Sequence, residues 1–355
     1  MKKINIVLLI VLVLIIGGIA IILNFHVANP GKEPVQVSLE DMTLEEKVYQ
    51  MMVISASDIK DDTITFGGVV YFKKDIETLE GIQSKLAAAQ KGKKTPPILA
   101  VDEEGGRVSR LKDLYPELGQ TPLPPMAEIT DDGTETGAVL ADVLAKVGFN
   151  TDFAPVADVG QESAAIGDRA FSTDPAKTAI KVVGVVTALE SKNIITTLKH
   201  FPGHGSALAD THEGLSITDK SRESFEAVDF IPFEAGIAAG ADMIMTAHIT
   251  APALDPAGVP ATFSKPILTG ILREELDFEG VIITDALGMG AVAEKGTEGS
   301  IQAIEAGVDI LLMPLDYEAT KDAIIAAVKS GRLTEERINE SVMRILQMKA
   351  NHGMI

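Results

Sequence analysis

The feature that most constrains the fold is an alternation of short, wholly apolar runs with longer segments of helical periodicity. Continuous apolar strands separated by helices are typical of a parallel sheet that is buried on both faces. The expected strands are 68–72, 97–101, 149–156, 194–198, 243–247, 281–284 and 308–313, with a further one near 52–55. The expected helices are 76–90, 136–147, 175–192, 221–239, 265–276, 299–306, 318–330 and 335–349. Strands of this kind and number predict an eightfold barrel.

A doubly wound open sheet is the alternative arrangement for such strands. Two observations favour the barrel. No glycine-rich phosphate loop opens the first strand–helix unit, and charged residues follow several different strands at their C-terminal ends, where barrel enzymes keep their chemistry. We therefore predict an α/β fold with a single (β/α)8 TIM-type barrel over residues 38–355. Only the helix at 335–349 follows residue 330, so we expect no second globular domain.

The N-terminal segment differs from the rest of the chain. Lys2 and Lys3 precede an unbroken apolar or glycine run over 6–23, which as a helix would span ~27 Å, close to the thickness of a bilayer core. We expect residues 1–25 to be an uncleaved transmembrane anchor and 26–37 a linker, with the domain outside the cytoplasm. A cleaved signal segment, giving a secreted protein, is the alternative. The candidate cleavage site at 26–28 begins with a bulky histidine, which disfavours it.

The formal net charge is −20 and cysteine is absent. An acidic surface repels nucleic acid backbones and anionic lipid headgroups. We therefore expect no nucleic acid partner, and contact with the membrane only through the N-terminal helix. The lack of cysteine excludes disulfides, thiolate metal sites and a cysteine nucleophile. The sequence leaves the oligomeric state open, and we favour a monomer.

The densest reactive cluster is Lys-His-Phe-Pro-Gly-His-Gly at 199–205, followed by Asp210 and His212. Its proline and glycines predict a shaped loop that leaves a strand. The histidines could pack a tight loop, hold a metal ion or transfer protons. We expect no metal, because the spacing lacks the regularity of zinc sites and Lys199 would place a positive charge beside the cation. In the third interpretation, the Asp210 carboxylate bonds to the His212 ring and fixes its tautomer.

Three further candidate segments follow predicted strands. Asp285 comes directly after a buried strand, where it could serve chemistry or simply cap a helix. Residues 102–110 combine carboxylates, two glycines and two arginines, a mixture that suits a polyol because sugar hydroxyls both donate and accept. An exposed ion-pair loop is the alternative there. Arg169 lies in another such loop, at 167–172.

The segments 102–110, 167–172, 199–212 and 284–290 together resemble the signature segments of family 3 glycoside hydrolases. The closest likeness is to the single-domain bacterial branch, the β-N-acetylglucosaminidases or β-hexosaminidases. The segments occur in the family's order, cover most of the chain from residue 38, and include one highly specific string at 199–212. The resemblance implies a (β/α)8 barrel and exo-acting, retaining hydrolysis of terminal β-linked N-acetylglucosamine.

The resemblance also implies residue roles. Asp285 matches the nucleophile, and His212 matches the proton donor and acceptor, with Asp210 as its partner. The positions that grip the terminal sugar are matched by Asp102, Arg110, Arg169, Lys199 and His200. Arg107 and His204 are expected to support loops, and His248 matches a position on the rim of the barrel. No cofactor is implied.

Other functions remain open at this point. The chain could be a non-catalytic cell-wall sugar-binding protein, a barrel hydrolase that uses a metal, or a β-glycosidase or glycoside phosphorylase of the same family with another sugar or acceptor. The presence of Asp285, Asp210 and His212 together favours a catalyst. The expected partner is an N-acetylglucosamine-containing glycan or muropeptide, with peptidoglycan fragments as the natural source.

Overall fold

A computed structural model describes residues 39–205 and 216–355, which belong to one compact unit, Val37–Ile355. Within these residues, eight parallel strands follow one another around a closed ring in the order of the sequence. Six direct pairings and the bridges Thr151–Ile195 and Ile283–Ile310 close it. The ring strands are β1 (Met52–Ser55), β2 (Gly68–Tyr71), β3 (Ile98–Val101), β6 (Thr151–Asp152), β7 (Thr197–Phe201), β9 (Met243–Thr246), β11 (Val281–Thr284) and β12 (Leu311–Leu312). The predicted α/β barrel with a parallel sheet is confirmed.

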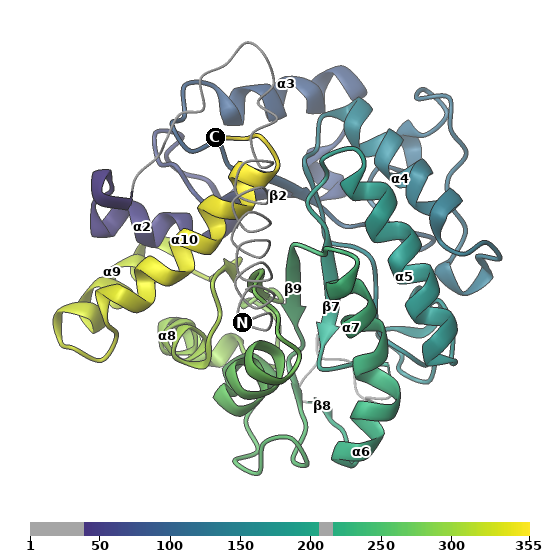
Figure 1. The fold of residues 1–355 in the computed structure, drawn as a ribbon. Coiled ribbons are helices and arrows are strands. Elements are labelled where there is room, and N and C mark those ends of the chain that lie inside the picture. Colours follow the sequence, from purple (N-terminus) through teal and green to yellow (C-terminus); the bar gives the residue numbers. More distant parts are fainter. Residues whose placement is uncertain (1–38, 206–215) are drawn as a thin grey trace, which may run out of the picture. The chain divides into compact units, whose positions relative to one another are not determined.

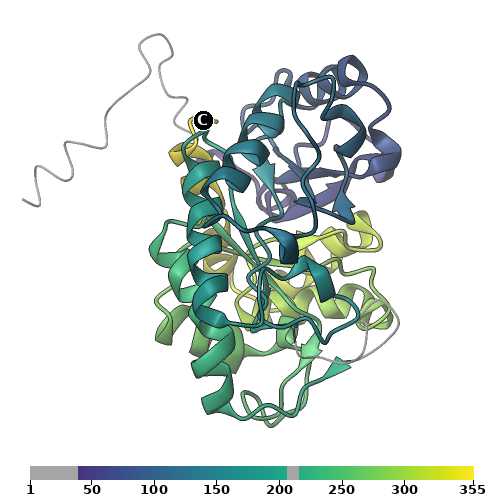
Figure 2. The ribbon, with the colours of Figure 1, turned by 90° about the vertical axis from the view of Figure 1, so that its right-hand side faces the viewer.

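Helices surround this ring (Figures 1 and 2). The longer ones are α2 (Leu44–Gln50), α3 (Leu79–Gln90), α4 (Thr134–Val147), α5 (Pro175–Glu190), α7 (Phe230–Ala238), α8 (Gly296–Ala306), α9 (Tyr317–Lys329) and α10 (Glu335–Asn351). Helix α5 packs between α4 and α7, and α2 packs against both α9 and α10. The first and last helices of the barrel are therefore neighbours, which joins the two ends of the described chain.

Shorter elements complete the described chain. Two π-helical segments are η7 (Phe225–Asp229) and η9 (Pro266–Glu275), and the short helix α6 (Arg222–Ser224) precedes the first of them. The 3-10 turns are Leu39–Asp41, Ala56–Asp58, Lys73–Asp75, Lys112–Leu114, Met126–Glu128, Gly167–Arg169 (η6), Ala261–Phe263 and Ala293–Lys295. Outside the ring, β4 (Glu103–Gly105) pairs antiparallel with β5 (Val108–Ser109), and β8 (Ser216–Ile217) pairs parallel with β10 (Ile249–Thr250).

Every residue of the ring strands is buried, as expected for strands covered on both faces. The sequence pattern placed β1 and β11 at their observed bounds. The expected strand at 149–156 pairs regularly only over Thr151–Asp152, and Pro155 cannot donate a ladder hydrogen bond beyond it. The expected strand at 194–198 begins later and continues through Lys199 and His200 to Phe201, with a register shift against β9.

Local sequence explains where several helices begin. Thr43 caps α2 through a reciprocal box, because its hydroxyl accepts from the Glu46 N–H at 3.2 Å and the Glu46 carboxylate accepts from the Thr43 N–H at 2.7 Å. The helix expected at 221–239 is broken instead into α6, η7 and α7. Pro232 lies in the first turn of α7, where it lacks an N–H and its ring crowds the preceding turn, so a wider π-turn ahead of it relieves the conflict.

The membrane anchor predicted for 1–25 and the linker predicted for 26–37 lie outside the described residues. Over 39–205 and 216–355, no helix combines the length and the apolar character needed to cross a bilayer.

Candidate active site

The barrel gathers the predicted reactive residues because its strands are parallel. Asp102 directly follows β3, Lys199 and His200 lie near the end of β7, and Asp285 directly follows β11. The C-terminal ends of parallel strands open on the same face, so residues separated by more than a hundred positions come to one end of the barrel.

Lys199 is the centre of the cationic part of the site. Its side chain is only 2% exposed, and its ammonium lies 2.8 Å from Asp102 Oδ1 and 2.6 Å from Glu104 Oε1. Burial by itself would lower the pKa of Lys199, but the charges of Asp102 and Glu104 raise the pKa above its ordinary value. Lys199 therefore stays positively charged in a place where little water reaches it.

Glu104 also fixes Arg169, which lies in the turn η6. Two guanidinium nitrogens, Nε and Nη2, donate to the two Glu104 oxygens at 2.8 Å each, and Nη1 donates to the Ala165 carbonyl at 2.9 Å. Burial opposes ionisation of Glu104, yet the charges of Arg169 and Lys199 hold the Glu104 pKa well below its ordinary value. A fork-to-fork pair of this kind sets the plane of the guanidinium group as well as its position.

Arg107 holds the loop that carries Arg169. Its guanidinium donates to the carbonyls of Ala165 and Ile166 at 3.0 and 2.8 Å and lies 2.9 Å from the Asp168 carboxylate. Arg107 thus contacts the loop as expected for a support residue.

Arg110 and Asp102 form the more exposed part of the cluster. Arg110 Nη2 lies 3.6 Å from Asp102 Oδ2, and their side chains are 29% and 19% exposed. The Arg110 guanidinium also lies over the Phe72 ring, 6.0 Å from its centre. One Asp102 oxygen thus contacts the buried Lys199 ammonium, and the other lies near the partly exposed Arg110 guanidinium. The Asp102 carboxylate, 19% exposed, remains accessible to a ligand hydroxyl. An isolated surface ion pair, the alternative considered for this loop, does not describe this arrangement.

His200 is oriented by Asp158, a fully buried residue that follows β6. One Asp158 oxygen lies 2.7 Å from His200 Nδ1 and accepts the His200 backbone N–H at 3.2 Å, while the other accepts the His204 N–H at 2.6 Å. Burial would raise the Asp158 pKa, but His200 and His204 lower it, so this carboxyl is ionised. With its Nδ1–H committed to Asp158, His200 presents Nε2 on its other side, 3.5 Å from Arg169 Nη2.

Asp285 is partly buried at the end of β11. Its Oδ1 accepts the Ala286 backbone N–H at 2.7 Å, and its own N–H donates to the Thr246 carbonyl at 3.2 Å. Burial would raise the Asp285 pKa, but the nearby charges of His200 and His248, the Ala286 N–H and the charge of Lys199 lower it. Asp285 therefore carries a carboxylate close to the Lys199 cluster. No helix begins directly after it, since the next helical residues are those of the 3-10 turn Ala293–Lys295, so it is not a helix cap.

His248 lies beside Asp285 on the same rim. It is buried, with Nδ1 2.7 Å from the Thr262 hydroxyl and Nε2 3.1 Å from the carbonyl of Ala286, the residue after Asp285. These contacts connect β9 to the segment that carries the Asp285 carboxylate.

A third buried carboxylate, Glu103, lies next to Asp102. It accepts hydrogen bonds from the Ser109 hydroxyl at 2.5 Å, the Leu111 N–H at 2.8 Å and the Tyr115 hydroxyl at 3.1 Å. Burial raises the pKa of Glu103 despite these donors. The three bonds tie the segment that carries Arg110 to the strand end that carries Asp102.

The structure thus brings together six of the predicted site residues, Asp102, Arg110, Arg169, Lys199, His200 and Asp285. Asp210 and His212 lie outside the described residues, and their roles stay predictions. Sequence reasoning overlooked the partners Glu104 and Asp158. Each offered a weak signal, because an acidic residue inside or just after a buried strand requires a compensating charge.

Comparisons with known proteins show what the chain is similar to. The model of the Glycosyl hydrolase family 3 N terminal domain matches residues 43–348. The chain is 38% identical over 281 residues to a beta-hexosaminidase of Xylella fastidiosa, covering 76% of this chain and 81% of that protein. It is 37% identical over 259 residues to a beta-hexosaminidase of Stenotrophomonas maltophilia, covering 69% and 75%.

A solved structure is also similar to this chain. The glycoside hydrolase family 3 beta-N-acetylglucosaminidase from Paenibacillus sp. superimposes with a TM-score of 0.83 at 32% identity, over 88% of this chain. The match spans 63% of that longer chain, which is less than two thirds of its length.

Proposed function

Since the chain belongs to glycosyl hydrolase family 3 and is thereby a glycoside hydrolase, we propose that it releases terminal β-linked N-acetylglucosamine with retention of configuration. The family membership confirms the resemblance seen in the four motif segments. The beta-hexosaminidase and beta-N-acetylglucosaminidase names of its relatives support the choice of sugar. The observation that carries the proposal is the ionised Asp285 carboxylate beside the Lys199, Arg169 and His200 cluster.

In the proposed first step, Asp285 attacks the anomeric carbon of the bound sugar. The bond from that carbon to the glycosidic oxygen breaks, and His212 donates a proton to the departing oxygen. In the second step His212 takes a proton from water, and the water displaces Asp285 from the sugar. Asp210 keeps the His212 ring in the tautomer that these transfers need. A lowered pKa suits Asp285, because a nucleophile has to be ionised before it attacks.

The cationic cluster is proposed to bind the terminal sugar. Asp102 accepts from sugar hydroxyls, while Lys199, Arg169 and Arg110 donate to them, and the ionic contacts among these groups hold them in place beforehand. Such pre-organisation lets sugar binding proceed without a large cost of ordering side chains.

For the natural substrate we propose N-acetylglucosamine-containing peptidoglycan fragments. The support is the predicted export of the domain, since these glycans lie outside the cytoplasmic membrane. The domain would be tethered to the cell membrane by residues 1–25, or secreted if that segment is cleaved.

The test compares Asp285→Ala, His212→Ala and Asp210→Ala on aryl β-N-acetylglucosaminides. Asp285→Ala loses the nucleophile, so turnover of every substrate falls by more than about 10⁴-fold. His212→Ala slows sugar-linked substrates by roughly 10²–10⁴-fold but leaves the first step on acidic phenols much less affected, because these phenols depart without a proton. Asp210→Ala gives a milder form of the same defect. Asp322→Asn, whose side chain is 73% exposed, is the matched control and keeps wild-type rates.

Labelling with a slow fluorinated sugar identifies the nucleophile. The covalent adduct is expected on Asp285, and it persists in His212→Ala because the second step lacks its base. An adduct on another residue, or equal slowing of good and poor leaving groups in the first step, contradicts the assignment. Parallel assays on a β-glucoside, and with added phosphate, distinguish a different sugar or a phosphorolytic reaction from the proposed hydrolysis.

A further inference from the structure

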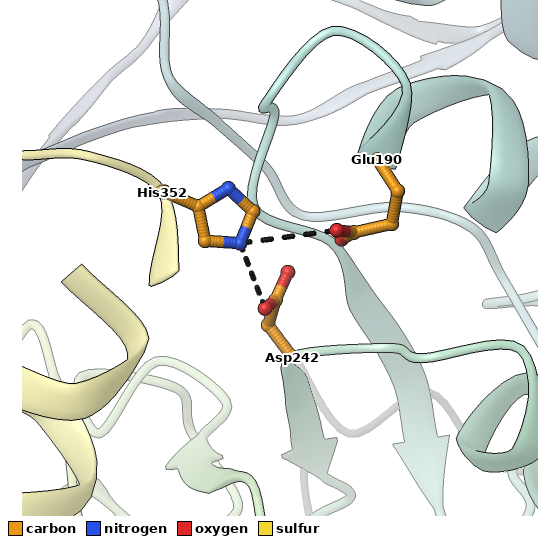
Figure 3. Close-up of side chains that lie close together, drawn as sticks. All are labelled: Glu190, Asp242 and His352. Carbon is orange, nitrogen blue, oxygen red and sulfur yellow. Dashed lines mark hydrogen bonds and ion pairs between the residues drawn. The ribbon is translucent and has the colours of Figure 1, made fainter. Parts of the chain in front are cut away.

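A second cluster of ionisable residues lies at the opposite end of the barrel. Figure 3 shows the His352 ring and the carboxylates of Glu190 and Asp242 pointing toward one another. Glu190 ends α5, Asp242 immediately precedes β9, and His352 follows the last residue of α10. Because Asp242 precedes its strand whereas Asp285 follows one, the cluster lies at the N-terminal face, one strand length or about 13 Å from the catalytic face.

The three side chains converge on a small space. Asp242 Oδ1 lies 2.8 Å and Glu190 Oε2 lies 3.9 Å from His352 Nε2. One ligand atom from each residue falls within 4.8 Å of the other two. Ligands around a tetrahedral zinc ion stand roughly 3.3–3.6 Å apart, since each is about 2.0–2.2 Å from the metal. A small widening of the 2.8 Å pair and a small movement of the Glu190 side chain, which is 29% exposed, would complete that geometry.

The surroundings hold the ligand atoms in place. The Thr196 backbone N–H donates to Asp242 Oδ2 at 2.9 Å, while Oδ1 lies 2.8 Å from His352 Nε2. The Thr196 hydroxyl lies 3.4 Å from Glu190 Oε1. Metal-bound carboxylates are usually oriented by such outer hydrogen bonds.

The His352 ring is buried and hydrogen-bonded, with its side chain only 5% exposed. Its Nε2 lies 2.8 Å from Asp242 Oδ1, where the ring N–H donates to the carboxylate, and the ring also has a backbone hydrogen bond with Asn193. A cation would displace the Nε2 proton, and Nε2 would then offer its lone pair to the ion.

The ligand set suits a divalent cation. Once deprotonated on binding the ion, Glu190, Asp242 and His352 would supply two carboxylates and one neutral imidazole, which balance two positive charges. The mixed oxygen and nitrogen set suits zinc better than magnesium.

We propose that Glu190, Asp242 and His352 form a binding site for a divalent transition-metal ion, with zinc as its best-fitting occupant. The ion would connect the end of α5, the start of β9 and the residue after α10, and so fasten the C-terminus to the base of the barrel. Its role is structural and lies apart from the proposed hydrolysis, because the site faces away from Asp285.

The test titrates metal-free, full-length protein, kept in a non-ionic detergent and carrying no polyhistidine tag, with zinc chloride and with magnesium chloride. The variants are His352→Gln and Glu190→Gln, and Asp322→Asn is the exposed control. We expect wild type and Asp322→Asn to bind one zinc equivalent and to show a Tm rise of about 5 °C at a hundredfold excess over Kd. Each cluster variant should bind that equivalent at least about tenfold more weakly and lose the Tm rise, and magnesium should have little effect.

Two outcomes would overturn the proposal. If wild type binds no zinc, the cluster is a hydrogen-bonded triad only. If both cluster variants bind zinc as wild type does, the ion sits elsewhere, for example at the predicted catalytic loop. Glu190→Gln keeps the shape of the side chain and removes a carboxyl that burial disfavours, so it remains a folded reporter even if His352→Gln is unstable. Calorimetric binding requires no enzymatic activity, so failure of this proposal is distinguishable from failure of the proposed function.

Discussion

At the residue scale, the site depends on buried acidic residues that hold its basic side chains in place. Glu104 holds Arg169 and Lys199 at 2.6–2.8 Å, and Asp158 holds His200 at 2.7 Å. Both carboxyls are buried, yet both have a lowered pKa because of their basic partners. An acid whose folded pKa is lowered contributes stability above its unfolded pKa of about 4 and loses it as the pH falls. These ion pairs therefore stabilise the site at neutral pH, and that stabilisation is lost in acid.

Asp158 gives the sharpest prediction at this scale. In Asp158→Asn the oxygen can still accept the His204 N–H, but the amide nitrogen that replaces the other oxygen faces both Nδ1 and the backbone N–H of His200 and accepts from neither. The His200 ring then loses the carboxylate that fixes its orientation and the position of its proton. We expect kcat/KM on an aryl β-N-acetylglucosaminide to fall roughly tenfold to a hundredfold, the loss expected for about 1.5–3 kcal/mol.

Steady-state kinetics and the pH profile of kcat/KM check this positioning role. A structural change alone would lower Tm and leave the pH profile unchanged. A variant with wild-type kcat/KM and an unaltered profile would show that the orientation of His200 does not matter for turnover.

At the element scale, glycines set how closely the outer helices approach the loops beside them. A Cβ on Gly184, in the middle of α5, would lie 2.4 Å from the Asp132 carbonyl oxygen ahead of α4. Such a contact requires the backbone of one element to move. Gly270, inside η9, has nothing within 4 Å of the same position.

These two glycines form a matched pair for a stability measurement. Gly184→Ala is expected to lower the free energy of unfolding by about 1–3 kcal/mol, because overpacking forces α5 away from the Asp132 loop. Gly270→Ala is expected to be neutral or to stabilise by up to about 1 kcal/mol, since alanine restricts the unfolded chain and favours helix. Denaturant unfolding measures the free energy of unfolding of both variants. Equal effects would mean that a methyl group at position 184 meets no steric resistance.

At the scale of the whole molecule, the sequence has a net charge of −20, while the site at the C-terminal face holds the cations Lys199, Arg169 and Arg110. The acidic exterior favours solubility and a neutral glycan over nucleic acid, while the cations at the site are committed to buried carboxylates. The apolar run over 6–23 adds a predicted location to this picture, outside the cytoplasm and attached to the membrane.

That location is testable with the full-length chain in a Gram-positive host. We expect the protein at full length in the membrane fraction, resistant to high salt and released by detergent, because about 27 Å of apolar helix partitions into the bilayer core. Recovery of a shortened protein beginning near Asn29 from the medium would instead support cleavage of a signal segment.

The local sequence pattern was sufficient to predict much of the fold. Apolar runs of strand length separated by helical segments predicted the barrel and the bounds of β1 and β11, because burial on both faces leaves a continuous apolar run in the sequence itself. The same pattern placed Asp102 and Asp285 at strand ends, and parallel strands bring such ends together. The capping box at Thr43 and Glu46 was equally local, since its contacts span three residues.

Only the tertiary structure decided which distant residues contact one another. Glu104 meets Lys199, Asp158 meets His200, and Glu190 and Asp242 meet His352, pairs that no short window of sequence contains. The register shift in β7 and the π-turn ahead of Pro232 likewise depend on neighbouring strands and helices. The sequence determined which segments had to be buried, because burial follows from side-chain chemistry. Only closure of the barrel decided which buried charges face one another, because that depends on strand order, register and side-chain direction at once.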